Sequence, residues 1–439
     1  MIHEVAKEVI NDYFKENKIK RTGNWKLWLK TIVMFSIFLT PYFLILTLDF
    51  PGWAQLLLSI VMGIGMAGVG MNVMHDGNHG SFSNEEWVNR IMGSSIYILA
   101  GNVYNWQVQH NVLHHTYTNI HGHDEDLDAG RIMRFTEHSE WKWYHKFQHY
   151  YSVLLYGLLT INWAITTDFL QMKRYMKRKL SYGKLPNPLW NWSKLVISKI
   201  IYIAIWIIIP MVFLEIAWWK ILIGFFIMHY TAGLILSVVF QLAHVMEEAE
   251  MPQPTKDGEM KNTWAIHQQN TTINFSTKNK IVNWFTGGLN HQVEHHIFPN
   301  ISHIHYTKIS KIVKETAKEL NANWTLYRKQ AVDSAAQKQG KKKDDRSVRW
   351  SLEDVENYLA YAKNQADSLG YDMNGIRVYL GVYGKNAGQA KKDLTTMFLV
   401  PTGKISKSQA SSIILSFSDG DLPIDPLNDG QGGSEGYPQ

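Results

Sequence analysis

The sequence predicts an all-α integral membrane domain that is followed by a small soluble α+β module. Four apolar runs of about 22 residues lie before Met251, and roughly 20 helical residues are enough to cross the hydrocarbon layer of a bilayer. Tryptophan is concentrated in the same region, since 16 of the 17 tryptophans lie at or before Trp324. The chain beyond that point is polar, so we expect a membrane part and a soluble part.

The first two runs, Leu27–Leu48 and Trp53–Met74, are separated by the sequence Asp-Phe-Pro-Gly at residues 49–52. Proline and glycine favour tight turns, so these two runs are expected to form a helical hairpin. Residues 1–24 carry apolar side chains at helical spacing and predict an amphipathic helix on the membrane surface. A partly ordered tail is the alternative interpretation of that segment.

A second hairpin is predicted from Leu195–Ala217 and Trp219–Val245, which follow one another with almost no loop. Residues 91–104 are apolar but too short to cross, so we expect them to re-enter or to lie in the interface. The length of Tyr150–Phe169 does not decide whether this segment crosses the membrane. If the histidine clusters described below share one site, the second and third clusters lie on the same side of the membrane, so an even number of crossings separates them. The second hairpin already supplies two crossings, so we expect that Tyr150–Phe169 does not span.

Positive charge lies on one side of the predicted spans, and the turns on the opposite side contain only Lys220. Cytoplasmic loops are enriched in lysine and arginine. We therefore expect a multi-pass membrane protein with both termini and the histidine clusters in the cytoplasm. The supporting residues are Lys18, Lys20, Arg21, Lys26 and Lys30 before the first hairpin, and Lys173, Arg174, Lys177, Arg178, Lys179 and Lys184 before the second.

The net charge of +6 and the pI near 9.0 fit contact with anionic lipid headgroups. Nucleic-acid binding is not expected, because the basic residues flank the spans, apart from one short lysine-rich run. Cysteine is absent, which excludes disulfides, thiolate zinc sites and cysteine-held iron–sulfur clusters. Any metal must therefore have nitrogen and oxygen ligands. No secretory signal is expected, because the residues before the first run are charged throughout.

The soluble part has a predicted helix at its start. Ser351 is the expected N-cap with Asp354 as its capping-box partner, and Gly370 is the expected C-terminal stop. Residues 375–383 and 394–400 alternate as strands, and the module contains no motif that assigns it a function. The expected divisions of the whole chain are a membrane domain over 1–325, a lysine-rich linker over 326–349, the α+β module over 350–418 and a disordered tail over 419–439.

Three histidine clusters lie beside the predicted spans. They are His75-Asp-Gly-Asn-His79, His110-Asn-Val-Leu-His114-His115 and Gln292-Val-Glu-His295-His296. Residues at i and i+4 share one helix face, so the first two clusters each contain a pair that can hold one ion. His115 is offset by about 100° and can reach a second ion. A single pair more often has a structural role, but three clusters at span ends indicate metal binding, because ionisable groups near a bilayer are costly.

The ligand set narrows the choice of metal. Eight or more imidazoles exceed the needs of one four-coordinate zinc ion, and the sequence has no His-Glu-x-x-His. Imidazole suits iron, copper, nickel and zinc, and two ions with open positions for oxygen fit the count best. His244, near the end of the last run, is a further candidate ligand; a hydrogen bond to a neighbouring carbonyl is the alternative.

Other polar residues near the clusters are expected to surround the metal centre without binding the metal. Those that can orient the imidazoles are Asp76, Asn78, Asn111, Asp124, Asp126, Asn290 and Glu294. The histidines expected around the centre rather than in it are His121, His123, His291, His303 and His305.

These motifs resemble those of the membrane fatty acid desaturases. The shared pattern is His-x-x-x-His, His-x-x-x-His-His and Gln-x-x-His-His spread over four spans. The longer stretches MHDGNHG, QHNVLHHTYTN and LNHQVEHHIFP, which start at Met74, Gln109 and Leu289, are similar to those of bacterial acyl-CoA or acyl-lipid desaturases related to linoleoyl-CoA and front-end enzymes. The resemblance covers roughly residues 1–320.

The resemblance implies a non-haem di-iron enzyme that uses O₂ to introduce a cis double bond into a long acyl chain. Gln292 stands where many relatives have a histidine ligand, and Phe240 stands where stearoyl-type relatives have an asparagine ligand. Trp106 matches a residue that lines the acyl tunnel, with an interfacial anchor as the alternative. The implied catalytic iron ligands are His75, His79, His110, His114, His115, His295 and His296, with His244 as an additional histidine.

The implied substrate is an acyl group carried on CoA, on an acyl carrier protein or on a lipid. Front-end relatives often contain a fused cytochrome b5 domain with a His-Pro-Gly-Gly signature. That signature is absent from the sequence, so a separate ferredoxin or cytochrome b5-type donor with its reductase is expected. The alternatives are a membrane di-iron hydroxylase, a histidine-rich zinc hydrolase and a metal transporter. A transporter would place its ligands at mid-membrane, whereas these histidines lie at span ends.

Overall fold

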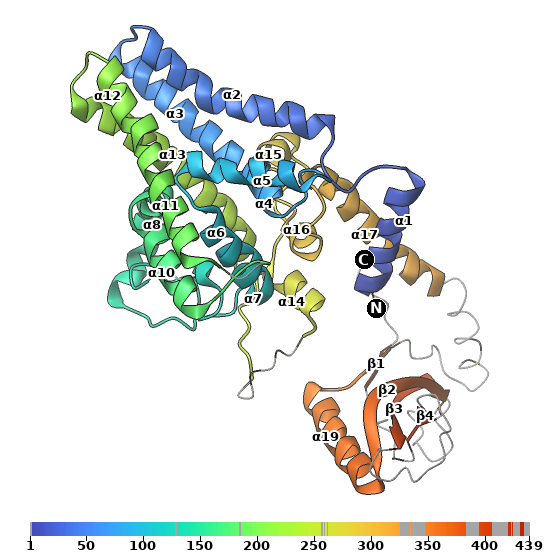
Figure 1. The fold of residues 1–439 in the computed structure, drawn as a ribbon. Coiled ribbons are helices and arrows are strands. Elements are labelled where there is room, and N and C mark those ends of the chain that lie inside the picture. The colour runs from blue at the N-terminus through green and yellow to red at the C-terminus, as the bar shows by residue number, and fades with distance from the viewer. Residues whose placement is uncertain are drawn as a thin grey trace. The chain divides into compact units, whose positions relative to one another are not determined.

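The computed structural model divides the chain into two compact units, Met1–Val313 and Lys314–Gln439, which are considered separately (Figure 1). The first unit is built from helices, and the second contains a helix and short strands. The structure describes residues 2–127, 130–183, 186–255, 258, 260, 262–324, 334, 337, 347–382, 395–405, 420–422, 424 and 431–433.

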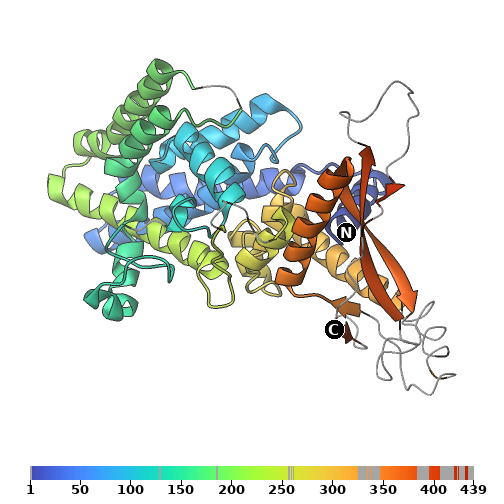
Figure 2. The ribbon, with the colours of Figure 1, turned by 90° about the horizontal axis from the view of Figure 1, so that it is seen from below.

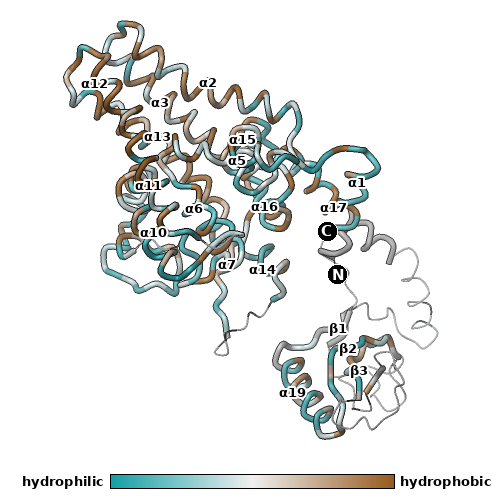
Figure 3. Tube along the Cα trace, in the orientation of Figure 1, coloured by the Kyte–Doolittle hydropathy of each residue, from teal (hydrophilic) through white to brown (hydrophobic). Residues whose placement is uncertain are grey.

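Four helical spans are long and apolar enough to cross a membrane, as the sequence predicts. Figure 3 shows the apolar residues concentrated on these spans. The hairpin layout and the cytoplasmic orientation stay predictions. The spans are α2 (Trp25–Thr47); α3, η1 and α4 (Gly52–Val69, Gly70–Met74 and His75–Asn78); α11, η7 and α12 (Pro188–Ile203, Ala204–Ile208 and Ile209–Phe213); and α13 (Trp218–His244).

The third span begins earlier than its apolar run predicts. It starts at Pro188 rather than Leu195. Asn187 caps this helix, because its side-chain oxygen accepts a hydrogen bond of 3.1 Å from the backbone N–H of Trp190. Proline fits the first helical position, where its missing N–H has no partner to lose. The polar residues between Pro188 and Leu195 therefore extend the helix beyond the apolar run.

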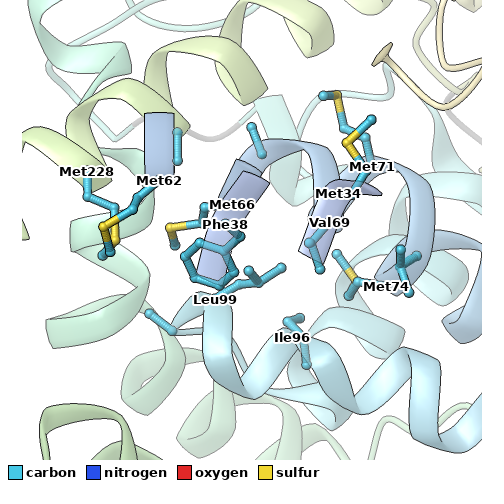
Figure 4. Close-up of a cluster of buried hydrophobic side chains, with 14 of the residues drawn as sticks. Met34, Phe38, Met62, Met66, Val69, Met71, Met74, Ile96, Leu99 and Met228 are labelled. Carbon is cyan, nitrogen blue, oxygen red and sulfur yellow. The ribbon is translucent and has the colours of Figure 1, made fainter. Parts of the chain in front are cut away.

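Glycines on α3 allow three spans to pack closely. A Cβ at Gly65 would overlap the backbone nitrogen of Phe38 on α2, and a Cβ at Gly63 would lie 2.5 Å from the carbonyl oxygen of Met228 on α13. Small residues permit this close approach of helix backbones inside membranes. Figure 4 shows the methionine-rich cluster that fills the space around these contacts. α3 contacts both α2 and α13, and Figure 2 shows the same unit from below, with α2 and α3 in blue.

The ambiguous segment around Tyr150–Phe169 is bent by 66° at a break between Tyr156 and Leu159. It is therefore a broken span or a re-entrant segment, and its expected place in the interface stays a prediction. The bent segment consists of η5 (Trp143–Phe147), α8 (Gln148–Tyr156), α9 (Leu159–Asn162), η6 (Trp163–Thr167) and α10 (Asp168–Arg178).

The N-terminal helix α1 (Ile2–Glu16) contacts protein where the sequence predicted a membrane surface. Ile10 and Phe14 are buried against Phe298 and Ile309. The same helical spacing suits a lipid surface and a protein groove, so periodicity alone does not distinguish them. The remaining elements of the first unit are α5 (Glu86–Ser94), η2 (Ser95–Leu99), α6 (Val103–Trp106), η3 (Gln107–His114), α7 (His115–Tyr117), η4 (Glu125–Leu127), α14 (Trp264–Thr271), α15 (Lys280–Phe285), α16 (Gln292–Ile297), η8 (His303–His305) and α17 (Tyr306–Trp324), which continues into the second unit.

The second unit contains the predicted helix, α19 (Leu352–Leu369), and its predicted caps are confirmed. Ser351 and Asp354 form the capping box, and Gly370 ends the helix with a φ of 79°. β2 (Tyr371–Val382), β3 (Thr395–Ile405) and β4 (Gly420–Asp421) form an antiparallel sheet in that order, and β1 (Ser347–Arg349) pairs with β5 (Gln431–Gly433).

The expected domain boundaries stay predictions. Most of the expected linker, residues 326–349, lies outside the described residues. In the expected disordered tail, residues 419–439, the described parts include the short strands β4 and β5.

Replacing Gly65 with valine is expected to destabilise the first unit, because the new side chain would overlap the backbone of α2. Overpacking of this kind costs about 1–3 kcal/mol. Thermal unfolding in detergent should show a lower midpoint for Gly65→Val. Gly52→Ala is the matched control, because a Cβ at Gly52 has no atom within 4 Å; equal midpoints for the two variants would contradict the predicted close contact.

Candidate metal centre

The three histidine clusters meet at the ends of the spans. His75 begins α4 and His79 is its C-cap, His110 and His114 lie on η3, and His115 begins α7. His295 and His296 lie on α16, and His244 is the last residue of α13. Elements separated by more than 200 residues in the chain thus contribute to one group of imidazoles.

Two π-helical segments precede or contain these histidines, a feature that the sequence did not predict. η1 directly precedes His75, and η3 contains both His110 and His114. A π turn adds a residue to the helical repeat and is frequent at functional sites. In η3 it stacks the rings of His110 and His114, whose centroids lie 5.3 Å apart at an interplanar angle of 23°.

The first histidine group combines all three clusters. One donor nitrogen from each member lies within 4.8 Å of the others, and the members are His75, His79, His110 and His295. Two nitrogens at about 2.1 Å from one ion, the distance found for zinc, are at most about 4.2 Å apart. A small contraction of this group would therefore allow one ion to contact all four rings.

The second group lies beside the first and consists of His114, His244 and His296. His115 connects the two groups, because its donor nitrogen lies within 4.8 Å of those of His295 and His296. Its Nε2 is 3.1 Å from Nε2 of His295 and 3.3 Å from Nε2 of His110. The i, i+4 pair His110 and His114 is divided between the two groups, although both also approach an oxygen of Asp126.

Buried ring nitrogens without hydrogen-bond partners test whether a metal fits here. Such atoms are costly, at about 1–3 kcal/mol for each unsatisfied polar group. Coordination of a cation would satisfy one lone-pair nitrogen on each of these rings, so the residues present fit a metal centre. The unpartnered nitrogens are Nδ1 and Nε2 of His75, Nε2 of His79, Nε2 of His114, Nδ1 of His115, Nδ1 of His244 and Nε2 of His296.

Protonation favours the same conclusion. Burial, with added repulsion from neighbouring imidazoles, holds the pKa values of His79, His110, His115, His295 and His296 well below their ordinary value of 6.5. These rings are therefore neutral at physiological pH, which is the form that binds a metal. His114 differs. Burial would lower the pKa of its ring, but the carboxylates of Asp124 and Asp126 outweigh burial and raise it.

Three outer contacts orient the imidazoles. His114 Nδ1 donates a hydrogen bond of 3.0 Å to Asp124, as predicted. His296 Nδ1 donates to the amide oxygen of Gln268 at 2.8 Å, and His295 Nδ1 lies 3.1 Å from the hydroxyl of Tyr306. Bonds of this type fix the tautomer of a metal-binding histidine. Gln268 and Tyr306 were missed in the sequence, because neither is adjacent to a cluster.

Other predicted orienting residues have different partners. The Asn78 side chain donates to the carbonyls of Met74 and Gly93, and Asn111 donates to the carbonyl of Asn78. Asn290 accepts a hydrogen bond from Thr286, while Glu294 accepts one from Asn274 and lies 3.7 Å from Nδ1 of His291. These four residues therefore hold the polypeptide segments around the centre and make no described bond to the rings of the two groups.

Asp76 links the first cluster to two distant residues. Its carboxylate accepts a hydrogen bond of 2.7 Å from the Ser302 hydroxyl and lies 3.0 Å from Nδ1 of His303. The other nitrogen of His303 is 3.0 Å from the ammonium nitrogen of Lys30. His303 thus lies around the centre, as predicted, and fixes the carboxylate beside His75, whose Nδ1 is 3.9 Å away.

An apolar cavity of about 180 Å³ leads away from the histidines between α3, α9 and α13. His75, His110, His114, His244 and Gln292 line one end, and the side-chain oxygen of Gln292 is buried without a partner. The predicted substrate residue Trp106 also lines the cavity, and its ring stacks on His110 at 4.4 Å. Phe240 lines the same end and stacks on His244 at 4.9 Å.

A buried histidine-rich centre that opens into an apolar cavity between membrane-crossing helices is the arrangement of an integral membrane enzyme acting on a long apolar chain. The chain belongs to the fatty acid desaturase family, whose family model, fatty acid desaturase, matches residues 51–328. It is accordingly a fatty acid desaturase, an oxidoreductase of lipid metabolism.

Curated relatives cover most of the first unit. The chain is 36% identical over 319 residues to an sn-1 linoleoyl-lipid 6-desaturase of Arthrospira platensis, spanning 72% of this chain and 85% of the relative. It is 34% identical over 328 residues to the enzyme of that name in Synechocystis sp., spanning 74% and 89%. An acyl-lipid (8-3)-desaturase of Physcomitrium patens is 30% identical over 325 residues, spanning 74% and 67%.

Removing the hydroxyl of Tyr306 is expected to weaken metal binding. The Tyr306→Phe variant leaves Nδ1 of His295 without its described partner. Loss of such an outer bond typically lowers metal affinity 10–100-fold, so we expect a decrease of at least roughly tenfold in a metal titration of the purified chain. Tyr117→Phe is the control, because Tyr117 is exposed. Unchanged affinity in Tyr306→Phe would show that this hydroxyl does not support the centre.

Proposed function

We propose that the chain is an O₂-dependent di-iron desaturase that introduces a cis double bond into an acyl chain of a membrane lipid. The observation that supports the proposal best is the pair of adjacent buried histidine groups at the end of an apolar cavity. The family match supports desaturation, and it favours this reaction over the hydroxylase, zinc hydrolase and transporter alternatives.

In this proposal the first group, His75, His79, His110 and His295, holds one iron. The second group, His114, His244 and His296, holds the other, and His115 binds at the junction of the two groups. Gln292 is proposed as an oxygen ligand near the second ion, because its buried side-chain oxygen faces the same end of the cavity. Phe240 packs against both His114 and His244, with ring centroids 5.6 and 4.9 Å away, and its aromatic ring cannot coordinate a metal.

When bound, two iron ions supply O₂ activation strong enough to remove hydrogen from an unactivated methylene, which no amino-acid side chain can do as a base. The chain's own residues position the substrate and exclude water. The apolar cavity walls hold the acyl chain with one carbon–carbon bond beside the histidines. Trp106 closes one side of that position, because its ring packs on His110 and on both rings of the first cluster.

The carrier of the acyl group is proposed from the relatives. The compared enzymes are named linoleoyl-lipid or acyl-lipid desaturases, so we infer an acyl-lipid substrate for this chain rather than acyl-CoA or an acyl carrier protein. A ferredoxin or a cytochrome b5-type protein with its reductase is the proposed electron donor. The centre is proposed to face the cytoplasm of a bacterial inner membrane, in agreement with the basic residues that precede each pair of spans.

Expression in a host without polyunsaturated lipids tests the reaction. We expect fatty-acid profiling to show a new product that has lost two hydrogens, whereas a hydroxylase would add one oxygen. His114→Ala should abolish the product, because it removes a member of the second group and the bond to Asp124. His149→Ala is the control, because His149 is exposed and belongs to neither group. Equal product from the two variants would contradict the assigned centre.

A further inference from the structure

The first unit has two further grooves beside the cavity, and they meet at the N-terminal turns of α11. A polar groove of about 940 Å³ reaches the metal centre at His79. An apolar groove of about 420 Å³ runs along α11 on the outer side of the bundle. Ser94, Tyr97, Trp190 and Lys194 line both grooves, so the two are continuous.

The apolar groove is separated from the inner cavity by the single turn η2. Ile96 and Leu99 are buried and point toward the inner cavity, where Figure 4 shows them opposite Met66, Val69 and Met74. Tyr97 and Ile98, which lie between these two residues in the sequence, line the outer groove. One short element therefore divides two apolar channels. The polar groove is continuous with the outer groove and reaches the metal centre at His79, whereas the inner cavity reaches the same histidine cluster at His75.

The junction has the residues expected at a membrane–water interface. Trp190 lies in the first turn of the third span and is 59% exposed, and the Lys194 ammonium lies 4.9 Å from the centroid of its ring. Tryptophan is enriched at this depth, and lysine there attracts anionic lipid headgroups. From the junction toward the C-terminal end of α11, the apolar groove continues along Ile197 and Ile201. Both side chains are more than half exposed on this candidate membrane span.

A polar compartment with one apolar channel on each side matches a lipid that has one headgroup and two tails. We propose that the substrate is a diacyl glycerophospholipid whose reacting chain enters the inner cavity while its other chain lies in the outer groove along Ile197 and Ile201. The headgroup occupies the polar groove, where Lys194 faces the phosphate. This inference rests on the proposed acyl-lipid desaturation and assigns the place of the chain that does not react.

The outer groove contributes by fixing the position of the second chain. It adds little hydrophobic binding energy, because the second chain is already in an apolar medium when it lies in the bilayer. A chain seated in the groove fixes the glycerol backbone relative to η2. The depth of the reacting chain in the cavity is then fixed as well. Small errors of position at a reacting centre can cost on the order of 10²-fold in rate, so the groove contributes to kcat/KM.

The test compares two substrates in nanodiscs, a phosphatidylglycerol with linoleoyl and palmitoyl chains and the lysophosphatidylglycerol that keeps only the linoleoyl chain. The full iron-loaded chain, supplied with O₂ and with a ferredoxin kept reduced by its reductase, is expected to favour the diacyl lipid by at least roughly tenfold in kcat/KM. Ile197→Trp together with Ile201→Trp should remove most of that preference by filling the groove, with turnover of the lysolipid unchanged. Val196→Trp with Ile200→Trp is the control, because these exposed neighbours on α11 do not line the groove.

Retained turnover of the lysolipid shows that the groove variant is folded. If the double variant no longer turns over the lysolipid, the single variant Ile201→Trp is compared with the unaltered chain on the same two lipids. Equal preference of the unaltered chain for both lipids, or equal losses in the groove and control variants, would overturn the inference and indicate an ordinary lipid contact. Failure of the unaltered chain to desaturate either lipid while it desaturates linoleoyl-CoA overturns the second-chain site and the proposed lipid carrier, but leaves the proposed desaturation standing. Failure with all three substrates overturns the proposed function as well.

Discussion

The fold depends on the burial of many imidazoles in one place. Eight histidine rings from four segments of the chain lie within contact of one another at the ends of the membrane-crossing helices. Neutral rings with inward-facing lone pairs are an unfavourable core unless a cation satisfies them. The packing of α2, α3 and α13 and the outer contacts through Asp124, Gln268 and Tyr306 all hold these rings in position.

The helices around the centre serve this arrangement. Close contacts at Gly63 and Gly65 fix α3 against its neighbours, and the span that α3 begins continues through η1 to the first histidine pair. The π turns then set the directions of the rings, and α16 brings the third pair from a distant part of the sequence. Binding of metal would therefore connect elements that otherwise have few direct contacts, which links metal uptake to the stability of this unit.

The sequence predicted the spans and the histidine clusters because their signals are local. Apolar length reveals a span, and the spacing of His75 and His79 reveals a shared helix face. The start of the third span at Pro188 was missed because capping by Asn187 is decided by one side chain and not by hydropathy. The burial of Ile10 and Phe14 was missed for a related reason, since an apolar helix face does not specify what covers it. Tyr306 and Gln268 approach the rings only through tertiary packing, which no local pattern encodes.

The methionines that line the inner cavity affect how well its wall fits the product of a desaturation reaction. Met66, Met71 and Met74 form part of its wall, and their side chains are unbranched and bend easily. An acyl chain that gains a cis double bond also gains a rigid kink. A wall of branched residues would fit only one of the two shapes, whereas thioethers can follow the chain from the straighter substrate to the bent product. Such plasticity would allow one cavity wall to stay in contact with the chain both before and after the reaction.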